Sequence, residues 1–87
     1  MILPAYEVSR IASFNLERCY FCIENLSADP VYILQQEAEK EVFLHHGFKI
    51  GQSGLFEMQN CLNPQSKKAW YVYGTSASDL DIRILDI

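Results

Sequence analysis

Features typical of membrane, secreted and nucleic-acid-binding proteins are scarce in this chain of 87 residues. No apolar run approaches the roughly 20 residues of a membrane-spanning helix, and Met1–Leu3 is too short, and too poor in flanking basic residues, for a secretory signal. Seven basic residues stand against eleven acidic ones, for a net charge of −4, whereas nucleic-acid binders need basic side chains to displace counterions from phosphates. We therefore expect a protein made in the cytoplasm that binds neither membrane nor nucleic acid.

Cysteine is also scarce, and its count is odd. The three residues are Cys19, Cys22 and Cys61, and an odd number argues against the disulfide framework of a secreted domain. Cys19 and Cys22 form a C-x-x-C pair within "RCYFCIEN", which has strand character, and residues three apart on a strand point to opposite faces. Redox pairs of this spacing instead begin a helix, where the helix N-terminus activates the thiol. The sequence therefore predicts two buried, unreactive thiols at Cys19 and Cys22.

Motifs for catalysis and metal binding are missing as well. No serine lies in a nucleophile elbow, and no glycine-rich loop is followed by a lysine at P-loop spacing. His45 and His46 would face opposite ways on a strand, so we interpret them as solvent-facing or turn residues rather than as zinc ligands completed by Cys61 or Glu57. Calcium-loop spacing is absent from the C-terminal acidic residues Asp79, Asp81 and Asp86. We expect no catalytic residue, no metal, no cofactor and no enzymatic activity.

The chain does contain strand periodicity. "RCYFCIEN" alternates apolar and polar residues, the turn-forming "LSADP" follows, and "VYILQQ" resumes the alternation, so a hairpin is predicted from Arg18 to Gln36. Further strands are predicted at Phe48–Ile50 and Leu55–Gln59, and the last two in "AWYVYG" and "DIRILDI". Apolar residues near the end of the chain should complete a sheet in the protomer or against a neighbour, namely Ile82, Ile84 and Ile87.

Residues 36–46 leave two alternatives open. Most residues of "EAEKE" are good helix formers, so a short helical turn can form there. An exposed, charged loop that opens into a strand at Val42–Leu44 fits the flanking strand pattern equally well.

Roughly six or seven short strands, with turn residues about every eight to twelve positions, predict an all-β fold. We expect a small antiparallel β-sandwich, jelly-roll-like, formed by residues 18–87. Residues 1–17 are predicted to form an extended N-terminal arm, because Pro4 blocks a continuous helix or central strand. Such an arm either crosses its own sheet or reaches a neighbouring subunit.

Three motifs follow one another in order along the chain: "IENLSADPVYI", then "GFKIGQSGLFEM", then "AWYVYGTSASDLDIRILDI". This order resembles a family of small tailed-phage virion proteins, over roughly Ser9 to Ile87. The charged "QQEAEKEVFLHH" and the long "NCLNPQSKK" depart from the family's usual connections. The positions that carry the resemblance are Asn25, Ser27, Val31, Tyr32, Ile33, Gly47, Ile50, Gly54, Glu57, Tyr71, Val72, Asp81 and Arg83.

The resemblance implies a structural virion protein, a capsid cement or decoration protein that forms a homotrimer and binds the major capsid protein. An adaptor of the neck, tail or fibre base is the alternative within the same family. Two other classes stay open: a carbohydrate- or receptor-binding module that uses Trp70, Tyr71 and Tyr73, and a small acidic inhibitor that mimics nucleic-acid charge. The residues we expect to contact a partner are Ile2, Tyr6, Ile11, Phe14, Tyr71 and Tyr73.

Overall fold

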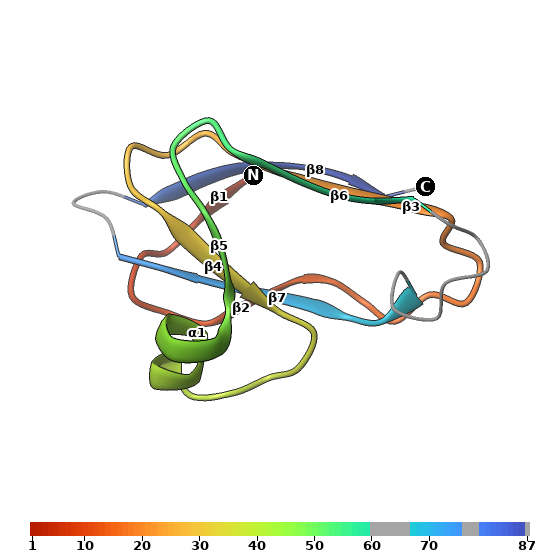
Figure 1. The fold of residues 1–87 in the computed structure, drawn as a ribbon, viewed down its shortest axis with the longest axis horizontal. Helices are drawn as coiled ribbons and strands as arrows, with labels where there is room; N and C mark the ends of the chain where they lie inside the picture. Colours follow the sequence, from red (N-terminus) through yellow and green to blue (C-terminus); the bar gives the residue numbers. More distant parts are fainter. Residues whose placement is uncertain (60–66, 76–78, 87) are drawn as a thin grey trace.

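The computed structural model describes residues 1–59, 67–75 and 79–86. These residues form eight strands and one short helix (Figure 1). The first half of the chain contributes β1 (Ile2–Leu3), β2 (Ser9–Ala12), β3 (Tyr20–Asn25), β4 (Val31–Leu34) and the helix α1 (Lys40–His46). The second half contributes β5 (Phe48–Ile50), β6 (Leu55–Gln59), β7 (Trp70–Gly74) and β8 (Leu80–Asp86), of which β5 and β6 have the bounds predicted from the sequence.

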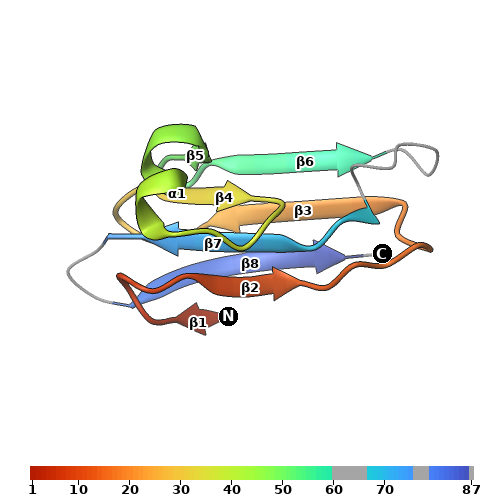
Figure 2. The same cartoon turned by 90° about the horizontal axis from the view of Figure 1, so that it is seen from below.

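The strands form two facing antiparallel sheets, with the orders β1-β8-β3-β6 and β2-β7-β4-β5 (Figures 1 and 2). β1 pairs with β8, β2 with β7, β3 with β6, and β4 with β5. The first strand therefore pairs with the last, the second with the next to last, and so on toward the middle of the chain. A long antiparallel ribbon rolled into two sheets has this pattern, which is the jelly-roll topology. The predicted all-β, jelly-roll-like sandwich is confirmed.

The N-terminal segment contributes a strand to each sheet. β1 lies at the edge of one sheet, where Ile2 is opposite Asp81, and β2 lies at the edge of the other, where Ser9 is opposite Val72. Residues 1–17 therefore cross the chain's own sheets, which is the first of the two alternatives for the predicted arm. These two short strands raise the total above the six or seven expected, because two to four residues are too few to establish a period.

The hairpin predicted from Arg18 to Gln36 is wrong in its pairing, although both of its strands exist. β3 lies in one sheet and β4 in the other, so residues 26–30 cross between the sheets. Among the described strands, β4 and β5 are the consecutive pair that shares a sheet. Alternation of apolar side chains shows that a strand has one buried face, but it does not choose the neighbour with which the strand pairs.

The core lies between the two sheets and is apolar. Alternate residues of β3 and β4 are fully buried, as are inward-facing residues of the last two strands, and the set comprises Phe21, Ile23, Val31, Ile33, Val72, Leu80 and Ile82. Trp70 stacks on Phe21 with ring centroids 5.2 Å apart, and Phe56 packs at a tilt against Trp70. β8 is an inner strand, so Ile82 and Ile84 complete the protomer's own sheet, whereas Ile87 lies outside the described residues.

Of the two alternatives for residues 36–46, the helical one is correct: α1 forms there, and the strand considered at Val42–Leu44 does not. α1 covers the outer face of the sheet that contains β4 and β7 (Figure 1). Phe43 is fully buried and packs against Tyr73, with ring centroids 6.3 Å apart. Gly47 ends the helix and donates its N–H to the Phe43 carbonyl; a Cβ at Gly47 would lie 2.5 Å from that oxygen, so the close approach requires glycine.

Candidate functional site

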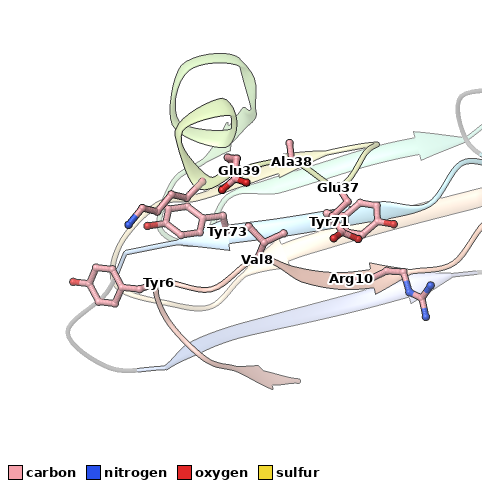
Figure 3. A pocket seen from close by; sticks show the side chains of 9 residues that line it. Tyr6, Val8, Arg10, Glu37, Ala38, Glu39, Tyr71 and Tyr73 are labelled. Atoms are coloured by element: carbon pink, nitrogen blue, oxygen red, sulfur yellow. The ribbon is translucent and has the colours of Figure 1, made fainter.

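A groove of about 650 Å³ lies on the outer face of the β2-β7-β4-β5 sheet, beside α1 (Figure 3). Three tyrosines line it. Tyr71 and Tyr73 come from β7, and Tyr6 comes from the connection between β1 and β2. Figure 3 shows Tyr6 at one end of the groove and Arg10 at the other, with Tyr73 and Tyr71 between them. The volume is within the range of about 300–1,000 Å³ that small-molecule sites occupy.

Strand geometry explains why these side chains meet. Tyr71 and Tyr73 are two residues apart on β7, so both point to the outer face of the sheet. The pairing of β2 with β7 sets Arg10 opposite Tyr71. The backbone N–H of Tyr6 donates to the carbonyl of Gly74 at 2.9 Å, which fixes Tyr6 beside the end of β7.

Tyr6 has an unusual backbone conformation. Its φ is 62°, a region that non-glycine residues occupy rarely, and for a bulky residue this conformation is strained. The side chain is 61% exposed, so packing in the core does not account for a tyrosine at this position. Strained residues of this kind cluster at binding and active sites, which makes Tyr6 the residue of the groove most in need of a functional explanation.

The groove carries balanced charges. Glu37 and Glu39 come from the connection between β4 and α1, and Arg10 and Lys40 come from β2 and the first residue of α1. Two formal negative charges and two formal positive charges cancel. The lining therefore combines aromatic surface, hydroxyl groups, cationic donors and anionic acceptors without a net charge.

A second surface feature is a set of large apolar side chains that are exposed to solvent. Phe14 and Leu16 are exposed on the connection between β2 and β3. Others lie on strands at the sheet edges: Ile2 on β1, Phe48 on β5 and Leu55 on β6. Exposed apolar side chains at strand edges and on a loop are available for contact with another protein.

Some of the residues expected to contact a partner are exposed, and others are buried. Ile2, Tyr6 and Phe14 are exposed, and Tyr71 is half-buried. Ile11 is buried in the protomer's core, because it follows the outward-facing Arg10 on β2, and the register shift between Arg10 and Ala12 leaves Ala12 buried as well. Tyr73 is only 3% exposed and packs against α1, so Ile11 and Tyr73 offer little surface to a partner.

Trp70 does not belong to a surface platform. It is 4% exposed and stacks in the core, and its indole N–H has no hydrogen-bond partner in the described part of the chain. The sugar-binding surface considered for Trp70, Tyr71 and Tyr73 is therefore wrong as regards Trp70. Residues two apart on a strand share a face, but Trp70 is one position out of step with both tyrosines and points inward.

The cysteine prediction is wrong for Cys19. Cys19 is disulfide-bonded, whereas Cys22 is a free, half-buried thiol. Cys61 lies outside the described residues. The sequence argued against a disulfide between Cys19 and Cys22, and these two residues are not joined, because Cys22 is a free thiol. An odd cysteine count nevertheless allows one disulfide with one thiol left over.

The acidic residues considered as a metal site are dispersed. Asp86 pairs with Arg18 at 2.6 Å, and Arg83 pairs with Glu24 at 3.3 Å. No group of three or more histidine, cysteine or acidic side chains is arranged for a metal in residues 1–59, 67–75 and 79–86. Both members of the His45-His46 pair are exposed at the end of α1, as solvent-facing residues.

Glu57 accepts a hydrogen bond from the hydroxyl of Tyr20, on the neighbouring strand β3. This hydrogen bond raises the pKa of Tyr20 above its ordinary value, because the neutral phenol donates to the carboxylate and ionising it would remove that hydrogen bond. The pair lies on the outer face of its sheet and stabilises the packing of β3 against β6.

Several positions that carried the family resemblance prove to be structural. Asn25 is fully buried, and its side-chain amide donates to the carbonyls of Asp29, Ile50 and Gly51 at 2.9–3.1 Å. Its side-chain oxygen accepts the backbone N–H of Ser27 at 2.9 Å. The motif residue Asn25 thus joins the connection after β3 to the turn after β5, and it holds the fold rather than a ligand.

The sequence matches no family model, and neither a curated protein nor a solved structure is similar to the chain at a significant level. In the parts of the chain that are described, no helix has both the length and the apolar character needed to cross a membrane.

Proposed function

We propose that this protein is a structural accessory component of a tailed-phage virion, a capsid cement or decoration protein that binds the major capsid shell. The exposed apolar side chains of the N-terminal segment and the sheet edges are the observation that carries this proposal. Burying such side chains against another protein contributes about 25 cal/mol per Å² of apolar surface, so several together supply a firm attachment.

The fold supports this role by analogy. Jelly rolls occur in viral capsid proteins, and also in lectins and cupins, so the topology alone does not determine the function. The family resemblance of the ordered motifs selects the virion among these possibilities. The disulfide at Cys19 is a second support, since disulfides persist on virion surfaces and in other oxidising surroundings.

The protein is proposed to act as a homotrimer. Its sheets end in the edge strands β1 and β6, and β2 and β5, whose outer backbone groups have no neighbouring strand in the described protomer. Unpaired edges invite pairing with another chain. Ile2, Phe48 and Leu55 lie on three of these four strands, so edge contacts between copies would bury apolar surface as well as satisfy backbone groups.

The decisive experiment is quantitative mass spectrometry of purified virions, with cryo-electron microscopy of the same particles. A cement protein should be present in hundreds of copies at symmetric positions on the shell. A neck or tail adaptor, the alternative, should be present in about six to twelve copies, as expected of a single ring. Absence of the protein from purified particles would refute both.

A pair of variants tests the attachment surface. The double variant Phe14→Ser, Leu16→Ser should release the protein from particles while leaving its unfolding midpoint nearly unchanged, because both side chains are exposed. Leu44→Ser is the matched control, since Leu44 is an exposed leucine on α1, away from that loop. Equal effects of the double variant and of Leu44→Ser on attachment would show that the loop is not the contact.

A further inference from the structure

We propose that the tyrosine-lined groove beside α1 binds a neutral oligosaccharide. This activity is separate from shell attachment, because the groove does not include the apolar side chains of the sheet edges or of the loop at Phe14. A virion protein with both surfaces would attach to the particle through its apolar side chains and bind a glycan through the groove.

The aromatic lining matches the chemistry of a sugar ring. A pyranose has an apolar face of C–H groups and a rim of hydroxyls, and a tyrosine offers an apolar ring with a polar hydroxyl at its end. Tyr71 is half-buried and Tyr6 is largely exposed, so both have ring surface free for stacking. Tyr73, which lies between them in Figure 3 and is buried, forms part of the floor.

The charges of the groove select a neutral ligand. Glu37 and Glu39 would repel a polyanion, and Arg10 and Lys40 would repel a polycation. A neutral ligand with many hydroxyls can use both kinds of group, because carboxylates accept hydrogen bonds and cationic side chains donate them. Among biological ligands, a neutral oligosaccharide combines this hydroxyl density with apolar faces.

Strand β7, which forms the floor of the groove, favours a ligand recognised by side chains over an extended peptide. β7 is paired on both sides, with β2 and with β4, so its N–H and C=O groups are already engaged in the sheet. A peptide that binds by adding a strand relies on unpaired backbone groups. Recognition over β7 must therefore use the side chains, and Tyr71 and its neighbours supply it.

The strain at Tyr6 is explained by this role. A glycine would adopt the φ of 62° without a steric cost, so a tyrosine at this position lowers local stability. The hydrogen bond from the Tyr6 N–H to Gly74 holds the ring at the end of the groove before any ligand arrives. A preorganised ring loses less freedom on binding.

The test uses the full-length protein on a glycan array that carries neutral oligosaccharides, sialylated and sulfated glycans and bacterial surface polysaccharides. The expected result is binding to a subset of neutral glycans, followed by titration of the best of them. Binding to no glycan, or to anionic glycans alone, overturns the proposal. So does NMR shift mapping in which unstructured peptides perturb the groove residues and the neutral glycan does not.

Tyr6→Gly separates binding from folding. Glycine relieves the strained φ and removes the ring, so affinity for the neutral glycan should fall about tenfold while the thermal midpoint is unchanged or higher. Ser53→Gly is the matched control, because Ser53 also has a positive φ, of 60°, in a turn outside the groove. Ser53→Gly should leave the affinity unchanged. Tyr71→Ala should also lower the affinity about tenfold, and unaltered affinity in both tyrosine variants refutes the site.

Discussion

Arg18 offers the sharpest test of how this small sandwich is stabilised. Its side chain is fully buried and lies over the ring of Phe21, 5.4 Å from the ring centroid. The guanidinium donates to both carboxylate oxygens of Asp86, at 2.6 and 2.9 Å, and to the backbone carbonyls of Ser13 and Lys68, each at 2.7 Å. It thereby joins the segment before β3 to the residues that precede β7 and to the end of β8.

Arg18→Met keeps most of the side-chain volume but removes every one of these donors. Breaking a buried ion pair costs about 3–5 kcal/mol. Because the Asp86 side chain is 34% exposed, water compensates that carboxylate in part, and we take about 3 kcal/mol as the expected loss. A domain of this size is stabilised by roughly 4–13 kcal/mol in total, so the substitution should remove a large share of it.

Urea unfolding followed by fluorescence is the assay, since Trp70 stacks on Phe21 and reports the core beside Arg18. Arg83→Met is the matched control: its pair with Glu24 is exposed, and its loss should cost less than about 1 kcal/mol. A double-mutant cycle with Asp86→Asn should give a coupling of about 1 kcal/mol or more. If Arg18→Met costs no more than Arg83→Met, the buried network does not stabilise the fold and the reasoning fails.

Three further predictions follow from individual contacts. Asn25→Leu should destabilise the protein by about 3 kcal/mol in urea unfolding, because it leaves the buried carbonyl of Ile50 and the partly buried carbonyls of Asp29 and Gly51 without their donor, whereas a surface Asn-to-Leu change is nearly neutral. Tyr20→Phe should lower the free energy of unfolding at pH 8, but the difference from wild type should fade above about pH 10. Because the pKa of Tyr20 is higher in the folded than in the unfolded protein, its stabilising effect is complete below the pKa of the unfolded state and is lost as the folded phenol ionises. A difference that grows with pH would contradict this. Reduction with dithiothreitol should lower stability by about 2–4 kcal/mol through the disulfide at Cys19, and Cys22→Ser should respond to reduction as wild type does.

Much of the fold was predictable from local pattern. The two-residue period located β3, β4, β5 and β6, and the buried faces follow the alternation, as in Phe21 and Ile23. The pairing of these strands was not predictable in the same way. The hairpin expected between β3 and β4 does not form, since β3 pairs with β6 and β8, and β4 pairs with β5 and β7.

The candidate groove was predictable only in part. Tyr6, Tyr71 and Tyr73 were among the residues expected to contact a partner, Tyr6 on the predicted N-terminal arm and the other two on a predicted strand. Neither Arg10 nor the segment at Glu37 and Glu39 could be added to them, because the groove brings together residues from β2, β7 and the connection to α1. No sequence pattern indicates the positive φ at Tyr6.

The amino-acid order by itself determined that this chain is built from short strands with one buried face, because side-chain alternation depends only on neighbours along a strand. It also determined the short turns, through glycine, proline, asparagine and aspartate at fixed places. Only the tertiary structure decided that the chain rolls as one long ribbon, that Arg18 and Asn25 fasten it from within, and that three tyrosines meet beside α1. The physical reason is that these features depend on contacts between distant residues, and such contacts exist only after the two sheets have packed together.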